Sequence, residues 1–225
     1  MRSGWNEVRS IAEEQWGLVT KRQIEKTGIA WSTVSRQVGI GGLERVAHGV
    51  YRLRGGAEPE HLALRAAWLQ LAPEAAVWER RPEQGVVSHR SAAHLYGIGH
   101  LAADSHEFTL PRRKQTRRED VWLHRGDVGD CWVQLRGLPV TKPSRIAADL
   151  LAGHEDPGAV AQVIADALRT GQDHPADVAE AVAPFAAAHG LSRGGGREML
   201  QMLLELSGDP RREVWLDEVQ EGDAK

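Results

Sequence analysis

The alternation of apolar and polar positions predicts two short helices at the start of the chain. In residues 7–16, apolar side chains recur at the i, i+3, i+4 and i+8 positions of an amphipathic helix. Thr20 is followed three residues later by Gln23, the spacing of a capping box, which predicts the start of a second helix. This second helix is expected over residues 21–27, with Gly28 closing it.

A third helix and a β-hairpin are predicted next. Ser32 is a candidate N-cap for a helix over residues 33–38, and the glycines that follow are expected to end it. Residues 43–46 and 49–53 then alternate apolar with polar, joined by a three-residue link that ends at Gly49. This order of elements is typical of a winged helix-turn-helix, in which the third helix enters the major groove of DNA and the hairpin is the wing.

The rest of the chain predicts a second domain and an α+β fold class overall. Residues 54–60 contain glycine and proline, so the expected domains are a winged helix-turn-helix over residues 1–56 and an α+β domain over residues 57–225. After helices near residues 60–72 and 88–97, short strands are expected in residues 106–140, and helices follow from Pro143 onward. The acidic last stretch, residues 217–225, is expected to be frayed.

Composition and charge narrow the class of protein. The chain has 225 residues, of which 41% are hydrophobic and 26% charged, enough to bury a core. One cysteine excludes an internal disulfide, and no apolar run reaches the length of a membrane span, so we expect a cytoplasmic protein with no membrane partner. The net charge of -3 is unevenly distributed along the chain, because residues 1–56 contain nine Lys/Arg and five Asp/Glu. A basic first part suits a polyanion-binding module.

The third helix carries the side chains best suited to base contacts. Its outer face presents hydroxyl, amide and guanidinium groups, which can meet base edges or phosphates, with Arg pairing with guanine and Gln with adenine. The alternative is an ordinary solvated helix. The candidate residues on or next to this helix are Ser32, Thr33, Ser35, Arg36 and Gln37.

Basic side chains of the hairpin and the second helix are candidates for phosphate contacts. Those of the hairpin would touch phosphates or enter the minor groove, which positions a protein without specifying a sequence. Those at the start of the second helix would act together with its exposed backbone N–H groups. Solvated surface charge is the alternative for each. The candidates are Lys21, Arg22, Arg45, His48 and Arg52.

Three other groups of polar residues could carry chemistry. Residues 88–94 combine two serines and two histidines, but neighbours in sequence need not have the geometry of a nucleophile and its base, so no catalytic residue is assigned. His100, His106 and His124 have no close spacing with carboxylates, so no metal site and no cofactor are predicted. The basic run over residues 112–118 is either a solvated loop or an extension of a nucleic-acid footprint.

Residues 16–53 resemble a known family. This segment is similar to the N-terminal winged-helix domain of the AbiEi-like antitoxins of type IV toxin–antitoxin systems. The similarity lies in the pattern GLVT, Q, GI, ST, R, LERV and GVYRL. A looser resemblance continues to about Gly171. The glycine-rich residues 39–42 differ from the Arg or Ser that relatives carry before the wing, so less charge is available there.

The resemblance implies a transcriptional repressor. It would bind repeats in double-stranded DNA upstream of its own operon and counteract a nucleotidyltransferase-like toxin encoded beside it. By this analogy the DNA side includes Lys21, Thr33, Arg36, Arg45 and His48. An alternative is a protein-binding antidote that neutralises the toxin directly, and a third is a nuclease; an enzyme is not proposed. The sequence leaves the oligomeric state open.

Overall fold

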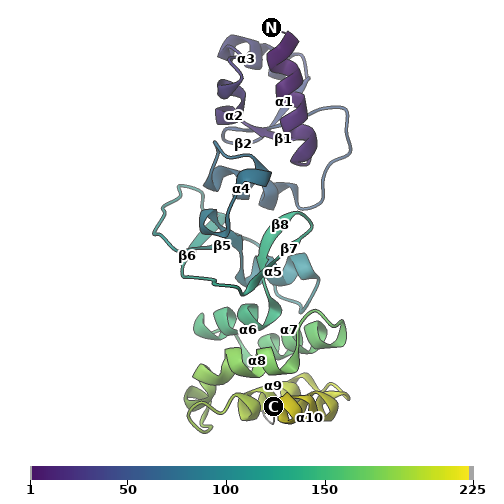
Figure 1. Cartoon of the computed structure of the whole chain (residues 1–225), viewed down its shortest axis with the longest axis vertical. Coiled ribbons are helices and arrows are strands. Elements are labelled where there is room, and N and C mark those ends of the chain that lie inside the picture. The colour runs from purple at the N-terminus through teal and green to yellow at the C-terminus, as the bar shows by residue number, and fades with distance from the viewer. Residues whose placement is uncertain (1, 223–225) are drawn as a thin grey trace. The chain divides into compact units, whose positions relative to one another are not determined.

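The computed structural model describes residues 2–222, and the chain forms two compact units (Figure 1). The first unit ends at Gly85 and the second begins at Val86. Both contain helices and a β-sheet, which confirms the predicted α+β class. The first unit is larger than the predicted domain of residues 1–56, because it also includes the segment up to Gly85. Separate folding of residues 1–56 stays a prediction.

The first unit is a three-stranded antiparallel sheet with helices on both faces. Strand β1 pairs with β3, and β3 pairs with β2, so the strand order is β1-β3-β2. The elements are α1 (Arg2–Glu14), β1 (Leu18–Thr20), α2 (Lys21–Lys26), α3 (Trp31–Gly39), β2 (Leu43–Ala47), β3 (Val50–Leu53), α4 (Leu62–Leu71) and two 3-10 turns (Val77–Glu79 and Pro82–Gln84).

Helices α1, α2 and α3 cover one face of this sheet. Cross-strand partners point to the same face, so Val19, Tyr51 and Arg45, which are paired in register, share a face. Val19 and Tyr51 are buried in one cluster with residues of the three helices, among them Val8 and Val34. The face of the sheet that carries Arg45 is therefore the face on which α3 packs.

Helix α4 covers the opposite face. Leu18 and Val50 are fully buried there. Thr20 donates its hydroxyl proton to the carbonyl oxygen of Pro73, just after α4, and Gln70 donates from Nε2 to the carbonyl oxygen of His48 at 2.8 Å. These hydrogen bonds join the segment after residue 56 to the sheet, which explains why the compact unit extends beyond the predicted boundary.

The predicted capping box of the second helix is confirmed. The backbone N–H of Gln23 donates to Oγ1 of Thr20 at 3.1 Å, and the N–H of Thr20 donates to Oε1 of Gln23 at 2.9 Å. Gly28 has a φ of +75°, the left-handed conformation expected after a helix.

The predicted cap of the third helix is wrong. Helix α3 begins at Trp31 with Ala30 as its N-cap, and no side chain accepts a hydrogen bond at that cap. The carbonyl oxygen of Ala30 instead accepts from the N–H groups of Thr33 and Val34. Trp31 is the first residue of the helix, and its ring packs edge-on against Tyr51, with centroids 6.1 Å apart. The Ser32 hydroxyl is left exposed.

The hairpin is confirmed, with a shorter turn than predicted. Only His48 and Gly49 connect the strands, because Ala47 still pairs with Val50 after a bulge that follows Arg45. The sequence analysis did not predict β1, a strand of three residues (Leu18–Thr20) that pairs with β3.

The second unit is a five-stranded mixed sheet followed by a set of helices. The strand order is β6-β5-β4-β8-β7, with parallel pairing of β5 with β6 and of β4 with β8. The elements are β4 (Val86–Val87), α5 (His89–Tyr96), β5 (His106–Leu110), β6 (Val121–Arg125), β7 (Trp132–Leu135), β8 (Leu138–Thr141), α6 (Pro143–Ala152), α7 (Pro157–Arg169), α8 (Pro175–Val182), a 3-10 segment (Ala183–His189), α9 (Gly196–Ser207) and α10 (Arg212–Gly222).

The C-terminal stretch differs from the prediction. Residues 217–222, expected to be frayed, belong to α10, and residues 223–225 lie outside the described residues. Trp215, Leu216 and Val219 of this helix are buried, so its apolar side chains hold it on the second unit. Among the described residues, no helix is both long and apolar enough to cross a bilayer.

Candidate nucleic-acid interface

Helix α3 presents a polar face to solvent. Its inward side is fixed by Val34, which is 1% exposed and belongs to the core of the first unit. Ser32, Ser35 and Arg36 are exposed on the other side. Among residues 2–222, Arg36 has no carboxylate within ion-pairing distance and no side-chain hydrogen bond, so its guanidinium can bind a ligand without first breaking a contact.

Thr33 and Gln37 lie at one flank of this face. Both are half-buried, and they line a groove of about 800 Å³ together with Arg36 and with Arg9 of α1. The Oε1 atom of Gln37 lies against Gly42, at 2.4 Å from the position that a Cβ there would take. Gln37 thus packs on the turn after α3 and is less accessible than Arg36.

Arg9 is a basic residue of this groove that the sequence analysis did not identify. It is exposed on α1, and Arg54, also exposed, lines the same groove, as does one carboxylate residue, Glu7. The positive balance of residues 1–56 includes both arginines, but charge alone does not show which of them lies beside α3.

Lys21 and Trp31 lie together at the N-terminal end of α3. The Lys21 Nζ atom is 4.6 Å from the centroid of the Trp31 ring, a cation–π contact, and Trp31 remains 45% exposed. Lys21 and Arg22 each pair with Glu25, at 3.6 and 3.3 Å. Exposed pairs of this kind are weak, so both cations remain available to phosphates.

The backbone at the start of α2 is less available than predicted. The N–H of Lys21 donates to the carbonyl oxygen of Gly49 at 2.8 Å, and the N–H of Gln23 donates to Thr20. Because these two donors are already bound, a phosphate at this position would be bound mainly by side chains.

The wing presents Arg45 and His48. Both are exposed, and Nη2 of Arg45 lies 3.2 Å from Nδ1 of His48. Arg45 is paired with Tyr51 across the hairpin, on the face of the sheet that carries α3. Arg45 therefore lies on the same side of the sheet as α3.

Arg52 lies on the other face of the sheet. It is paired in register with Glu44, and its guanidinium is 2.8 Å from Glu44 and 3.6 Å from Glu58. Only 14% of the Arg52 side chain is exposed. The hydrogen bond from Arg52 lowers the pKa of Glu44, although partial burial acts in the opposite direction. Arg52 thus binds carboxylates of the first unit itself, so its guanidinium is not available to a ligand as that of Arg36 is.

The serines and histidines of residues 88–94, in the second unit, point to different surroundings because most of this stretch is helical. Ser88 is fully buried and its Oγ lies 2.9 Å from Nδ1 of His89, whereas Ser91 is bound to the backbone of Ser105, and His94 is exposed. Burial lowers the pKa of His89, more than the nearby Asp149 carboxylate raises it. These contacts do not form a nucleophile–base pair at an exposed site, because Ser88 is inaccessible.

The fold of the first unit defines a class of protein. A helix, a strand, two further helices and a hairpin that closes a three-stranded sheet form a winged helix-turn-helix, with α3 in the position of the recognition helix. Residues 6–54 match a family model described as "Transcriptional regulator, AbiEi antitoxin". This match confirms the resemblance to AbiEi-like antitoxins over the winged-helix segment, and its description names a regulator rather than an enzyme.

A solved structure has a similar fold over most of the chain. The crystal structure of the RV2827C protein from Mycobacterium tuberculosis superposes with a TM-score of 0.51 at 16% sequence identity, covering 96% of this chain and 81% of that chain. At this identity the likeness shows the fold alone. No curated protein matches the chain.

Proposed function

We propose that this protein is a sequence-specific transcriptional repressor that binds double-stranded DNA through α3 and the wing. The observation that carries the proposal is the position of Arg36. Its guanidinium stands unpaired, among the described residues, on the exposed face of helix α3. A guanidinium in a recognition helix is the commonest group that reads guanine in the major groove.

Base contacts and phosphate contacts come from different parts of the interface. Ser32, Ser35 and Arg36 project from the exposed face of α3 and would meet base edges. Thr33 and Gln37 are half-buried at the flank of this face. They would approach the sugar-phosphate backbone of one DNA strand or the bases at the edge of the binding site. The residues proposed for phosphate contacts are Arg9, Lys21, Arg22, Arg45 and His48.

The proposed target is the promoter of the protein's own operon. The match to a family model described as a transcriptional regulator and antitoxin supports this choice of target, and we propose that the operator contains repeated sites. The second unit would then be free to act on the partner toxin, which by the same analogy is nucleotidyltransferase-like. In this proposal, repression uses the first unit and neutralisation uses the second. A substitution that abolishes DNA binding can therefore leave neutralisation intact.

The test is binding of the full chain to its own upstream DNA. Fluorescence anisotropy with a labelled upstream duplex and a scrambled duplex of the same composition, over a series of salt concentrations, separates specific from non-specific binding. We expect tighter binding to the upstream duplex by at least about a thousandfold, and a negative linear dependence of log K on log salt. Equal affinity for the two duplexes contradicts sequence-specific recognition.

The alternative function, direct neutralisation of the toxin, is tested in cells that carry a promoter fusion together with the neighbouring gene. A variant that does not bind DNA is expected to lose repression of a promoter fusion. If the same variant still protects cells from the neighbouring gene product, neutralisation proceeds without DNA binding. If wild-type protein leaves the promoter fusion fully active, the proposed repressor function is wrong.

A further inference from the structure

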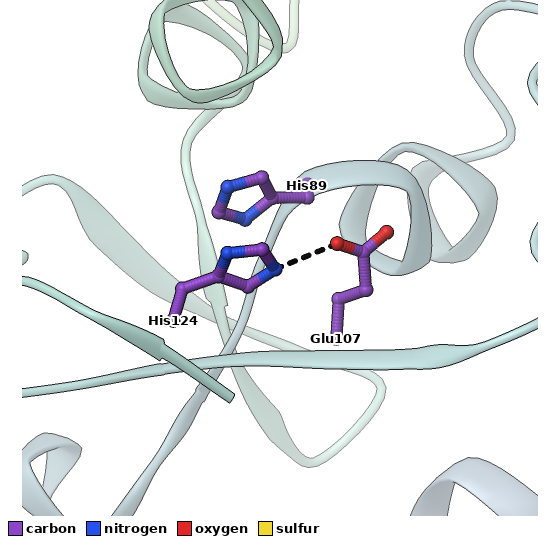
Figure 2. Close-up of side chains that lie close together, drawn as sticks. All are labelled: His89, Glu107 and His124. Carbon is purple, nitrogen blue, oxygen red and sulfur yellow. Dashed lines mark hydrogen bonds and ion pairs between the residues drawn. The ribbon is translucent and has the colours of Figure 1, made fainter. Parts of the chain in front are cut away.

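Two imidazoles and one carboxylate from three elements of the second unit lie together (Figure 2). His89 is the first residue of α5, Glu107 lies in β5 and His124 lies in β6. One ring nitrogen of each histidine and a carboxylate oxygen of Glu107 all lie within 4.8 Å of one another. In the parallel register of β5 and β6, Glu107 pairs with Trp122 and Thr109 with His124, so Glu107 and His124 project from the same face.

The three side chains contact one another directly. Nε2 of His124 lies 2.7 Å from Oε2 of Glu107, the contact drawn in Figure 2. The His89 ring stacks on the His124 ring, with centroids 3.6 Å apart and an interplanar angle of 15°. The exposed fraction of the side chain is 7% for Glu107 and 31% for His124, so the cluster is mostly buried but open on the His124 side.

A further carboxylate stands behind His89. Asp149 accepts a hydrogen bond from Nε of Arg145 through Oδ1 at 2.7 Å. Its Oδ2 is buried without a hydrogen-bond partner among the described residues and lies 4.0 Å from Nδ1 of His89. Carboxylates that orient a metal-binding histidine occupy this kind of position.

The backbone at His89 is held in an uncommon conformation. His89 has a φ of +51°, which a non-glycine residue adopts at a cost of about 1–3 kcal/mol. This conformation places the imidazole over His124, at the edge of a cleft of about 720 Å³. The cleft also holds Arg125 and Arg145, and it gives a small ion a path to the three donors.

We propose that His89, Glu107 and His124 bind one divalent cation of the zinc class. Two imidazole nitrogens and a carboxylate oxygen are a ligand set that zinc uses, with bonds of about 2.0–2.2 Å. Binding of the ion would replace the His124–Glu107 hydrogen bond and the ring stack with bonds to the metal. Three protein ligands leave a fourth coordination position open to water from the cleft.

The test is metal binding by the full-length protein after treatment with a chelator and dialysis. Calorimetric titration with Zn2+ is expected to show one saturable site, and Co2+ is expected to give the intense visible absorption of a four- or five-coordinate ion. Glu107→Gln and His124→Gln are each expected to weaken Zn2+ binding by at least about tenfold. His124→Gln keeps an amide N–H that can donate to Glu107, so a hydrogen bond between the two side chains remains possible in the variant.

His100→Gln is the matched control, because His100 is exposed in the loop after α5 and lies outside the cluster. Its Zn2+ affinity is expected to equal that of the wild type. Thermal melts with and without Zn2+ give a second readout: the ion should raise the Tm of the wild type and of His100→Gln, but not that of Glu107→Gln. The proposal is overturned if Zn2+ does not bind saturably, or if it binds equally to all variants, which indicates adventitious surface binding.

Discussion

Arg45 and Arg52 lie on opposite faces of the wing, although both are basic residues of one short hairpin. The register pairs Arg45 with Tyr51 on the face covered by α3, and it pairs Arg52 with Glu44 on the face away from it. The two arginines therefore make a matched pair of variants, since the same change of charge is made on two sides of one sheet.

Arg45→Ala is expected to weaken binding to upstream and scrambled DNA by the same factor and to reduce the salt slope by about 1, because a phosphate contact carries no sequence information. Arg52→Ala is expected to leave the affinity for DNA within about twofold, because its guanidinium binds Glu44 and Glu58 instead. Anisotropy titrations at several salt concentrations measure both. If Arg52→Ala lowers the salt slope as much as Arg45→Ala does, the assignment of the two faces is incorrect.

Arg36→Ala is expected to reduce discrimination at one base pair of the operator. Loss of a bidentate contact to guanine costs about 1–3 kcal/mol for the upstream duplex and little for scrambled DNA. Arg81→Ala is the control, because Arg81 is an exposed arginine of the same unit that lies outside α3 and the wing. An equal loss on both duplexes would show that Arg36 contacts a phosphate rather than a base.

Gly196→Ala is expected to destabilise the second unit. A Cβ at Gly196, the first residue of α9, would stand 2.3 Å from the backbone oxygen of Ala179 in α8. The two helices must separate to admit it, which costs about 1–3 kcal/mol. Chemical denaturation measures the effect. Gly39→Ala, at the end of α3, has no atom within 4 Å of the new Cβ and is expected to be neutral or stabilising by up to about 1 kcal/mol.

Asp209 is expected to contribute to the loss of stability in acid. Burial alone would raise its pKa, but the N–H of Arg211 at 2.8 Å and the guanidinium of Arg169 at 2.6 Å favour the carboxylate, and the pKa lies below its usual value. A carboxyl whose pKa is lowered by folding stabilises the protein above its unfolded-state pKa of about 4, and this contribution is lost as the pH falls toward the folded-state value.

The measurement is denaturant unfolding of wild type and Asp209→Asn between neutral pH and acid. The variant should be less stable at neutral pH, and the difference between the two proteins should shrink as the pH falls below about 4. A difference that stays constant over this range would mean that the carboxylate charge is not what stabilises the fold at Asp209.

The sequence by itself determined the features that depend on neighbouring residues. The Thr20–Gln23 capping box, the helix end at Gly28 and the turn at Gly49 each involve residues within a few positions of one another, so the chain specifies them locally. The order of helices and hairpin that identifies the winged helix-turn-helix follows from such local signals. Arg36 could be named for the same reason, because a helix over residues 33–38 with Val34 inward leaves it outside.

Only the tertiary structure decided which residues share a surface. The contact between Trp31 and Tyr51 depends on the packing of α3 against the sheet, and the separation of Arg45 from Arg52 depends on the register of the wing. His89, Glu107 and His124 come from a helix and two strands, so their spacing in the sequence shows no ligand pattern until β5 and β6 pair. Contacts between residues far apart in the chain are set by packing and strand register, and a single sequence read in local windows does not contain them.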